Sequence, residues 1–101
     1  MAGRKRDENT DYLIKAILSL QTEDECYDFF EDLCTVAELS EMSRRLTAAK
    51  MLHENKIYTE IAEKTGLSTA TISRVNRCLK YGRDGYLKIL QKLADTESGG
   101  E

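Results

Sequence analysis

The sequence predicts an all-α fold of about six helices, and three features of its 101 residues support that prediction. Apolar residues recur at intervals of three and four positions, which is the spacing of one face of an α-helix. The chain contains no proline, so these periodic stretches run without a helix breaker. Gly66 separates two short amphipathic stretches and can adopt a positive φ without the steric penalty of a Cβ atom. We therefore expect one small helical domain with a sharp chain reversal after residue 65.

The first ten residues carry a basic segment, Arg4-Lys5-Arg6, without apolar periodicity. We interpret residues 1–10 as a disordered arm, which either follows a DNA groove or is a solvated tail. Residues 11–21 form the first predicted helix. Its wide apolar stripe consists of Leu13, Ile14, Ile17, Leu18 and Leu20.

The second predicted helix begins at Thr22 or Glu23 and is apolar on nearly every side. A helix of this kind needs cover on more than one face, and a small monomer offers little material to cover it. We interpret it as part of a subunit interface in a homodimer, with a satellite core as the alternative. Its apolar residues are Cys26, Tyr27, Phe29, Phe30, Leu33 and Cys34.

The middle of the chain predicts a helix-turn-helix. Residues 35–39 are expected to link to a third helix over residues 40–54. Ile57 is a poor N-cap residue for the helix that follows, so Thr59 is an alternative start. Two short helices then flank Gly66, and either Ser68 or Thr69 can cap the second one. Their inward faces consist of Ile61, Ala62 and Thr65, and of Leu67, Ile72, Val75 and Leu79.

After the helix-turn-helix, over about residues 58–80, a turn with two glycines leads to a last helix over residues 85–95, which Asp84 can cap. The polar residues 96–101 are predicted to form a disordered tail. The predicted organisation is thus an arm (residues 1–10), a single helical domain (residues 11–95) and a tail (residues 96–101).

Several classes of function are excluded by the composition. No run approaches the ~18 apolar residues of a membrane helix, and the N-terminus lacks the apolar segment of a secretion signal, so we expect a cytoplasmic protein without a membrane partner. No nucleophile–base pair and no glycine-rich phosphate loop is present, so we predict no catalytic residues and no enzyme activity. We also predict no metal site, because metal-ligand spacing is absent from Cys26, Cys34, Cys78 and His53.

The net charge of −3 argues superficially against binding to nucleic acid, but the charges are unevenly distributed. Residues 1–39 carry four Lys/Arg against ten Asp/Glu, whereas residues 58–83 carry five against two. Residues 40–57 also carry a net positive charge, with four against two. The local field, rather than the net charge, sets the attraction for phosphates. The positive charge therefore lies on and just before the predicted helix-turn-helix.

The outward face of the second short helix predicts that the motif binds double-stranded DNA. Small hydroxylated and methyl-bearing residues at its N-terminal end allow a helix to enter a major groove, and arginines further along can reach guanine edges or phosphates. The residues that we expect to contact DNA are Thr59, Ser68, Thr69, Ala70, Thr71, Ser73, Arg74, Arg77 and Lys80. The alternative is a helical protein–protein interaction module whose polar face is only solvated.

Three segments of the chain resemble the Trp repressor superfamily: residues 39–46 (LSEMSRRL), 58–62 (YTEIA) and 68–75 (STATISRV). The whole chain is most similar to the small TrpR-like YerC/YecD family. The resemblance implies an intertwined homodimer of six-helix protomers. It also implies binding to a palindromic operator and transcriptional repression.

The resemblance further implies a place for a small-molecule corepressor. In the tryptophan-sensing member, two arginines and a glycine after the second arginine help to hold the amino acid. Arg74 matches the second arginine, and Arg45 matches the first, with Arg44 as the alternative. The glycine is replaced by Val75, whose branched side chain stands where an indole ring would enter. We therefore expect no resident cofactor, an effector of unknown identity if there is one, and no binding of tryptophan.

Overall fold

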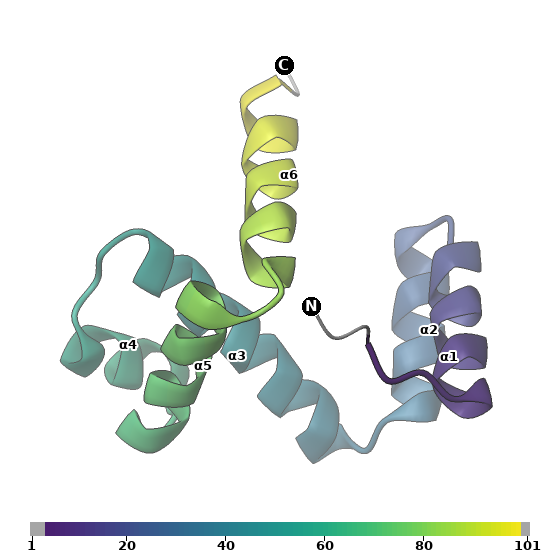
Figure 1. Ribbon diagram of the computed structural model, residues 1–101, viewed down its shortest axis with the longest axis horizontal. Coiled ribbons are helices and arrows are strands. Elements are labelled where there is room, and N and C mark those ends of the chain that lie inside the picture. The colour runs from purple at the N-terminus through teal and green to yellow at the C-terminus, as the bar shows by residue number, and fades with distance from the viewer. Residues whose placement is uncertain (1–3, 100–101) are drawn as a thin grey trace. The chain divides into compact units, whose positions relative to one another are not determined.

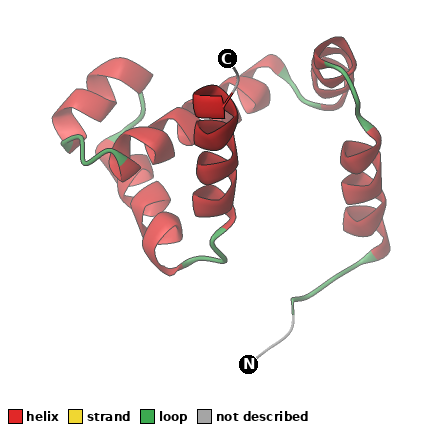
Figure 2. Cartoon of the chain, turned by 90° about the horizontal axis from the view of Figure 1, so that it is seen from above, coloured by secondary structure: helices red, strands yellow, loops and turns green. Residues whose placement is uncertain are grey.

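The computed structural model describes residues 4–99, and these form six helices without a strand (Figure 1). Short loops connect the helices (Figure 2). The chain divides into two compact units, one that ends at Val36 and one that begins at Ala37. The helices are α1 (Glu8–Ser19), α2 (Glu23–Leu33), α3 (Val36–His53), α4 (Tyr58–Thr65), α5 (Thr69–Tyr81) and α6 (Gly85–Gly99). The prediction of an all-α fold with about six helices is confirmed. None of the described helices is long and apolar enough to cross a membrane.

Helix α1 begins three residues earlier than predicted, because Asp7 caps it. The Asp7 carboxylate accepts hydrogen bonds from the backbone N–H of Thr10 at 2.8 Å and from its hydroxyl at 2.9 Å. These two bonds hold the pKa of the Asp7 carboxyl below its ordinary value. Arg6 Nε also lies 3.1 Å from Asp11 Oδ1. The end of the predicted arm is thus helical from Glu8 onward, and residues 1–3 lie outside the described residues.

Helix α2 begins as predicted, with Thr22 at its N-cap. The Thr22 hydroxyl accepts from the Glu25 N–H at 3.1 Å, and the Glu25 carboxylate accepts from the Gln21 N–H at 2.8 Å. This reciprocal arrangement is a variant of the capping box. Neither α1 nor α2 contains a buried residue, although the rings of Phe29 and Phe30 pack edge to face at 5.3 Å. The first unit therefore has no buried core of its own among the described residues.

Helix α3 begins at Val36, four residues before the predicted start, so the expected linker is helical from Val36 onward. This segment has neither glycine nor proline, and the Ser43 hydroxyl donates to the Leu39 carbonyl at 2.7 Å within the helix. The helix ends where Asn55 adopts a φ of +66°. The Lys56 N–H then donates to the Met51 carbonyl at 3.0 Å, as in a Schellman-type helix end.

The core of the second unit lies where α3, α4, α5 and α6 contribute buried side chains. Ile61 on α4 and Ile72 on α5 are its largest fully buried side chains. Helix α3 contributes two fully buried small residues, Ala48 and Ala49. The core cluster consists of Ala48, Ala49, Ile61, Leu67, Ile72, Val75, Leu79 and Leu90.

Two further helix boundaries, the start of α4 and the end of α6, also differ from the sequence prediction. Helix α4 begins directly after Ile57, although that residue makes no capping bond, so the shift of the cap to Thr59 was wrong. Burial of Ile61 compensates for the weak cap. Helix α6 continues to Gly99, into the predicted tail, and the Thr96 hydroxyl donates to the Lys92 carbonyl at 2.9 Å. Residues 100–101 lie outside the described residues.

The two glycines between α5 and α6 have different roles. Gly82 ends α5 with a φ of −84°, so it is not needed for a left-handed backbone. A Cβ atom at this position would instead overlap the Cys78 carbonyl oxygen, which accepts from the Gly82 N–H at 2.9 Å. A Cβ atom at Gly85, by contrast, would meet nothing within 4 Å.

We predict that Gly82→Ala lowers the free energy of unfolding by about 1–3 kcal/mol, because the added methyl group forces the end of α5 to move. The matched control, Gly85→Ala, should be neutral or stabilising by up to ~1 kcal/mol through the entropy of the unfolded chain. Urea denaturation at one fixed protein concentration measures both variants. Equal stability of the two variants would contradict this account of the turn.

Candidate nucleic-acid interface

The turn between α4 and α5 holds the two helices at a fixed crossing. Gly66 caps α4 with a φ of +75°, as predicted. The buried Thr65 hydroxyl donates to the Ile61 carbonyl at 2.8 Å and accepts from the Leu67 N–H at 3.2 Å. One side chain thus satisfies polar groups on both sides of the turn. Together with the burial of Ile72, these contacts fix the direction of α5 (Figure 1).

The N-terminal end of α5 is capped by Ser68, one of the two predicted residues. Its hydroxyl oxygen accepts from the Thr71 N–H at 3.1 Å and lies 3.1 Å from the Thr71 hydroxyl. Thr71 is half-buried, whereas Thr69 and Ala70 are exposed. Ser68 and Thr71 therefore organise the helix end, and Thr69 and Ala70 are the side chains that it presents to solvent.

The outward face of α5 forms a shallow, solvent-open groove of about 270 Å³. The groove brings together four of the residues predicted to contact DNA, and it adds Asn76 and Tyr81, which the prediction missed. Tyr81 is 82% exposed. Helical spacing could have identified both residues, because Asn76 follows Ser73 by three positions and Tyr81 follows Arg77 by four. Thr59 is exposed on α4 and does not line this groove. The groove is lined by Ser73, Arg74, Asn76, Arg77, Lys80 and Tyr81.

The charge of this face is positive and unpaired. Helix α5 contains Arg74, Arg77 and Lys80, all exposed, and no carboxylate. Within residues 4–97, none of these three side chains forms an ion pair with an N···O distance of at most 4.0 Å. The three cations of α5 are therefore available to an external anion.

A second, smaller cleft of about 80 Å³ lies between α3 and α5. Arg45 and Arg74, the two predicted effector-binding arginines, both line it, and so does Val75. Arg44, the alternative to Arg45, does not line this cleft. Its Nε donates to the Ser40 carbonyl at 3.4 Å, and its guanidinium group lies near Gly66, where an added Cβ atom would be 3.6 Å from Nη1. The remaining lining residues are Glu41, Thr71, Cys78 and Tyr86.

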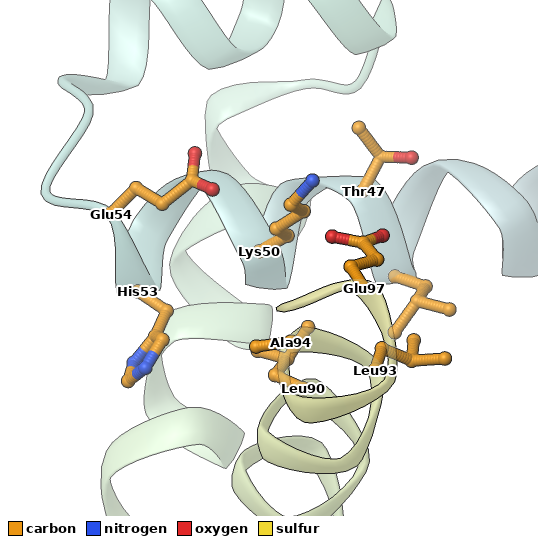
Figure 3. A pocket seen from close by; sticks show the side chains of 9 residues that line it. Thr47, Lys50, His53, Glu54, Leu90, Leu93, Ala94 and Glu97 are labelled. Carbon is orange, nitrogen blue, oxygen red and sulfur yellow. The ribbon is translucent and has the colours of Figure 1, made fainter. Parts of the chain in front are cut away.

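A third concavity, an apolar groove of about 250 Å³, lies between α3 and α6. Leu90, Leu93 and Ala94 of α6 face α3 across this groove (Figure 3). Polar side chains form its rim. Its other lining residues are Leu46, Thr47, Lys50, His53, Glu54 and Glu97. No group of three or more potential metal ligands occurs in the described part of the chain.

Comparisons with known proteins agree on one family. The family model described as Trp repressor protein matches residues 8–94. The uncharacterized protein YerC of Bacillus subtilis (strain 168) is 48% identical over 93 residues, which cover 92% of this chain and 89% of that protein. The crystal structure of a TrpR-like protein from Eubacterium eligens ATCC 27750 superposes with a TM-score of 0.86 at 54% identity and covers 88% of this chain and 92% of that one. A structure from Staphylococcus aureus, described as a candidate Trp repressor, has a TM-score of 0.84 at 47% identity, with 88% and 89% covered.

We predict that Ser68→Ala lowers the free energy of unfolding by ~1 kcal/mol, because it removes the acceptor for the Thr71 N–H at the start of α5. The matched control is Ser73→Ala, an exposed change in the middle of the same helix, which should stay within about 0.5 kcal/mol of the wild type. Both values come from urea denaturation at one protein concentration. A Ser68→Ala variant as stable as Ser73→Ala would show that the cap does not stabilise α5.

Proposed function

This chain belongs to the Trp repressor family, and we propose that it is a DNA-binding transcriptional regulator that acts in the cytoplasm. We further propose that it represses transcription by binding a palindromic operator as a homodimer, and that it has no catalytic activity. The observation that carries the proposal is α5, which exposes small residues at its N-terminal end and three unpaired cations along its outward face.

This arrangement suits a recognition helix in a major groove. The N-terminal residues of such a helix contact base edges, and residues further along lie nearer the flanking backbone. Thr69 can offer a hydroxyl and a methyl group to a base pair, and Ala70 can contact a thymine methyl. Arg77 and Lys80 lie two and three turns further along, where a cation positions the protein on phosphates without reading sequence.

Support for a homodimer comes from two exposed apolar surfaces, one on each unit. On the first unit, Tyr12 is 78% exposed and Leu18 is 79% exposed. On the second unit, the groove between α3 and α6 has an apolar floor, and Leu93 is 48% exposed (Figure 3). Exposed apolar patches of this kind mark interaction sites. We propose that α1 and α2 of a second copy cover the α3–α6 groove.

We predict that the protein sediments as a dimer of 23 kDa, twice the 11.5 kDa of one chain, at micromolar concentration. Leu18→Glu should shift the equilibrium toward monomer, because it places a charge on the proposed interface. Ile57→Glu is the matched control, since Ile57 is also exposed (67%) but lies outside the α3–α6 groove. A folded wild-type monomer in equilibrium sedimentation would overturn the proposed dimer.

The alternative function, a protein–protein interaction module, draws on the same exposed residues of the acidic first unit. In this alternative the chain binds a partner protein, whereas in the leading proposal it binds DNA. A single protein recovered in stoichiometric amount from a DNase-treated lysate, together with no affinity for DNA, would favour the module.

We predict that Thr69→Ala and Arg77→Ala weaken DNA binding in different ways. Thr69→Ala should change the base preference at one position of each half-site. Arg77→Ala should weaken binding to all sequences about equally and reduce the salt slope by roughly one unit per site. Fluorescence anisotropy over a range of salt concentrations, with a set of operator variants, measures both effects.

Wild-type protein that binds no genomic fragment at low salt would overturn the proposed function. A changed base preference in Arg77→Ala, with an unchanged salt slope, would instead show that our placement of α5 in the groove is wrong by about one turn.

We also predict that L-tryptophan is not a corepressor of this protein. Val75 lines the cleft that holds Arg45 and Arg74, and the cleft of about 80 Å³ is much smaller than the ~300–1,000 Å³ of typical small-molecule sites. Calorimetry should detect no heat of binding at millimolar L-tryptophan. A micromolar dissociation constant would contradict this steric argument.

A further inference from the structure

Tyr81 is an aromatic residue at the C-terminal end of α5 that the packing of the second unit does not use. It is 82% exposed, although the other two tyrosines of this unit, Tyr58 and Tyr86, pack against the core. Its hydroxyl forms no hydrogen bond within the described part of the chain. On the basis of the proposed DNA-binding function, we infer that Tyr81 is a DNA-contacting residue. Its hydroxyl donates to a phosphate oxygen of the DNA backbone that flanks the major groove.

Tyr81 lies on the same face of α5 as residues that are proposed to contact DNA. It lines the outward groove of α5 together with Arg77 and Lys80. Side chains four positions apart are neighbours on a helix surface, so Ser73, Arg77 and Tyr81 follow one another in a row along this groove. A helix that presents Arg77 to DNA therefore presents Tyr81 beside it.

The length of α5 determines which part of the DNA Tyr81 reaches. Tyr81 follows Thr69 by twelve positions (81 minus 69), which is about 18 Å along a helix that rises ~1.5 Å per residue. The major groove is only ~12 Å wide. When Thr69 lies at the base edges, Tyr81 therefore lies beyond them, beside the sugar–phosphate backbone. Tyrosine hydroxyls are among the side-chain groups that contact DNA phosphates.

The charges around Tyr81 favour a phosphate as its partner. Arg77 and Lys80 line the groove beside it, and α5 contains no carboxylate. The carbonyl end of a helix disfavours an anion, and Lys80 in the last turn opposes this effect. The phenol hydroxyl can then donate a hydrogen bond to the phosphate without adding a charge of its own.

A second copy of the chain is a less suitable partner for Tyr81. The proposed dimer interface covers the groove between α3 and α6, and no residue of α5 lines that groove. Tyr81 is therefore not part of the proposed interface, and loss of its hydroxyl should leave the dimer intact.

The test compares Tyr81→Phe with the matched control Tyr12→Phe, which removes a hydroxyl from a similarly exposed tyrosine (78%) of the first unit. The probes are a labelled duplex enriched from a random DNA library and a shuffled duplex of the same composition. Fluorescence anisotropy measures binding to both duplexes over a range of salt concentrations.

Tyr81→Phe should bind both duplexes about 5- to 10-fold more weakly, because it loses a hydrogen bond to a charged group. The loss should be similar for the two duplexes, since a backbone contact carries no sequence information. The salt slope should stay unchanged, because a neutral hydroxyl displaces no counterion from DNA. Tyr12→Phe should bind both duplexes as the wild type does.

A second arm of the test locates the contact on the DNA. One phosphate at a time is replaced by an uncharged methylphosphonate, which weakens binding where the protein contacts that phosphate. One position of each half-site should be sensitive to this change in the wild type and in Tyr12→Phe. The same position should lose its sensitivity in Tyr81→Phe.

The inference and the proposed function fail through different results. Wild-type affinity in Tyr81→Phe would overturn the inference alone, and so would a changed base preference, a reduced salt slope or a phosphate map identical to that of the wild type. A lower free energy of unfolding or a weaker dimer in Tyr81→Phe would also overturn it, because the hydroxyl would then have a structural role. If the wild-type protein binds neither duplex, the proposed function fails and the inference fails with it.

Discussion

The burial of Ile61 and Ile72 in one core is the constraint on which the second unit depends. Both side chains are fully buried, and they lie on the two helices that flank the Gly66 turn. Loss of either side chain would leave a cavity that costs about 2–5 kcal/mol, a large part of the stability of a small domain. Because the buried face of α5 is fixed in this way, its outward face is fixed as well. The orientation of the outward surface of α5 is thus a consequence of the core.

The core of one chain is nevertheless too small to cover all of its apolar surface. In the first unit, α1 and α2 bury no residue, although Phe29 and Phe30 pack together. In the second unit, the α3–α6 groove leaves apolar side chains exposed, among them Leu46 and Leu93. In the proposed dimer, α1 and α2 of one copy cover the α3–α6 groove of the other copy, so both apolar surfaces become buried. Folding of the first unit and assembly of the dimer are then one event. Stability should then depend on protein concentration.

The sequence predicted those parts of the fold that depend on local chemistry. Gly66 was identified from the steric freedom of glycine, and Ser68 was one of two hydroxylated residues identified as a possible cap of α5. The start of α2 at Thr22 or Glu23 was also predicted. Boundaries decided by tertiary packing were not predictable in this way. Helix α4 begins after Ile57 despite the missing cap because Ile61 is buried, and no local pattern records that burial.

In the candidate sites, too, some features follow from local sequence and others depend on tertiary packing. Helical spacing placed Ser73, Arg74 and Arg77 on one outward face, and in the structure these three residues line a single groove. The choice between Arg44 and Arg45 could not be made from the sequence, because it depends on how the end of α3 is oriented toward α5. The structure brings Arg45 to the cleft, together with Glu41, whose presence there the family resemblance did not suggest.

The most direct test of the central claim is to select bound fragments from a random library of double-stranded DNA. If two copies of α5 read DNA from a symmetric dimer, the enriched fragments should contain an inverted repeat. The half-site centres should lie about one helical turn, ~34–36 Å, apart or a multiple of that distance. Enrichment of no sequence, or of a single motif without two-fold symmetry, would contradict the account of this protein as a dimeric, sequence-reading regulator.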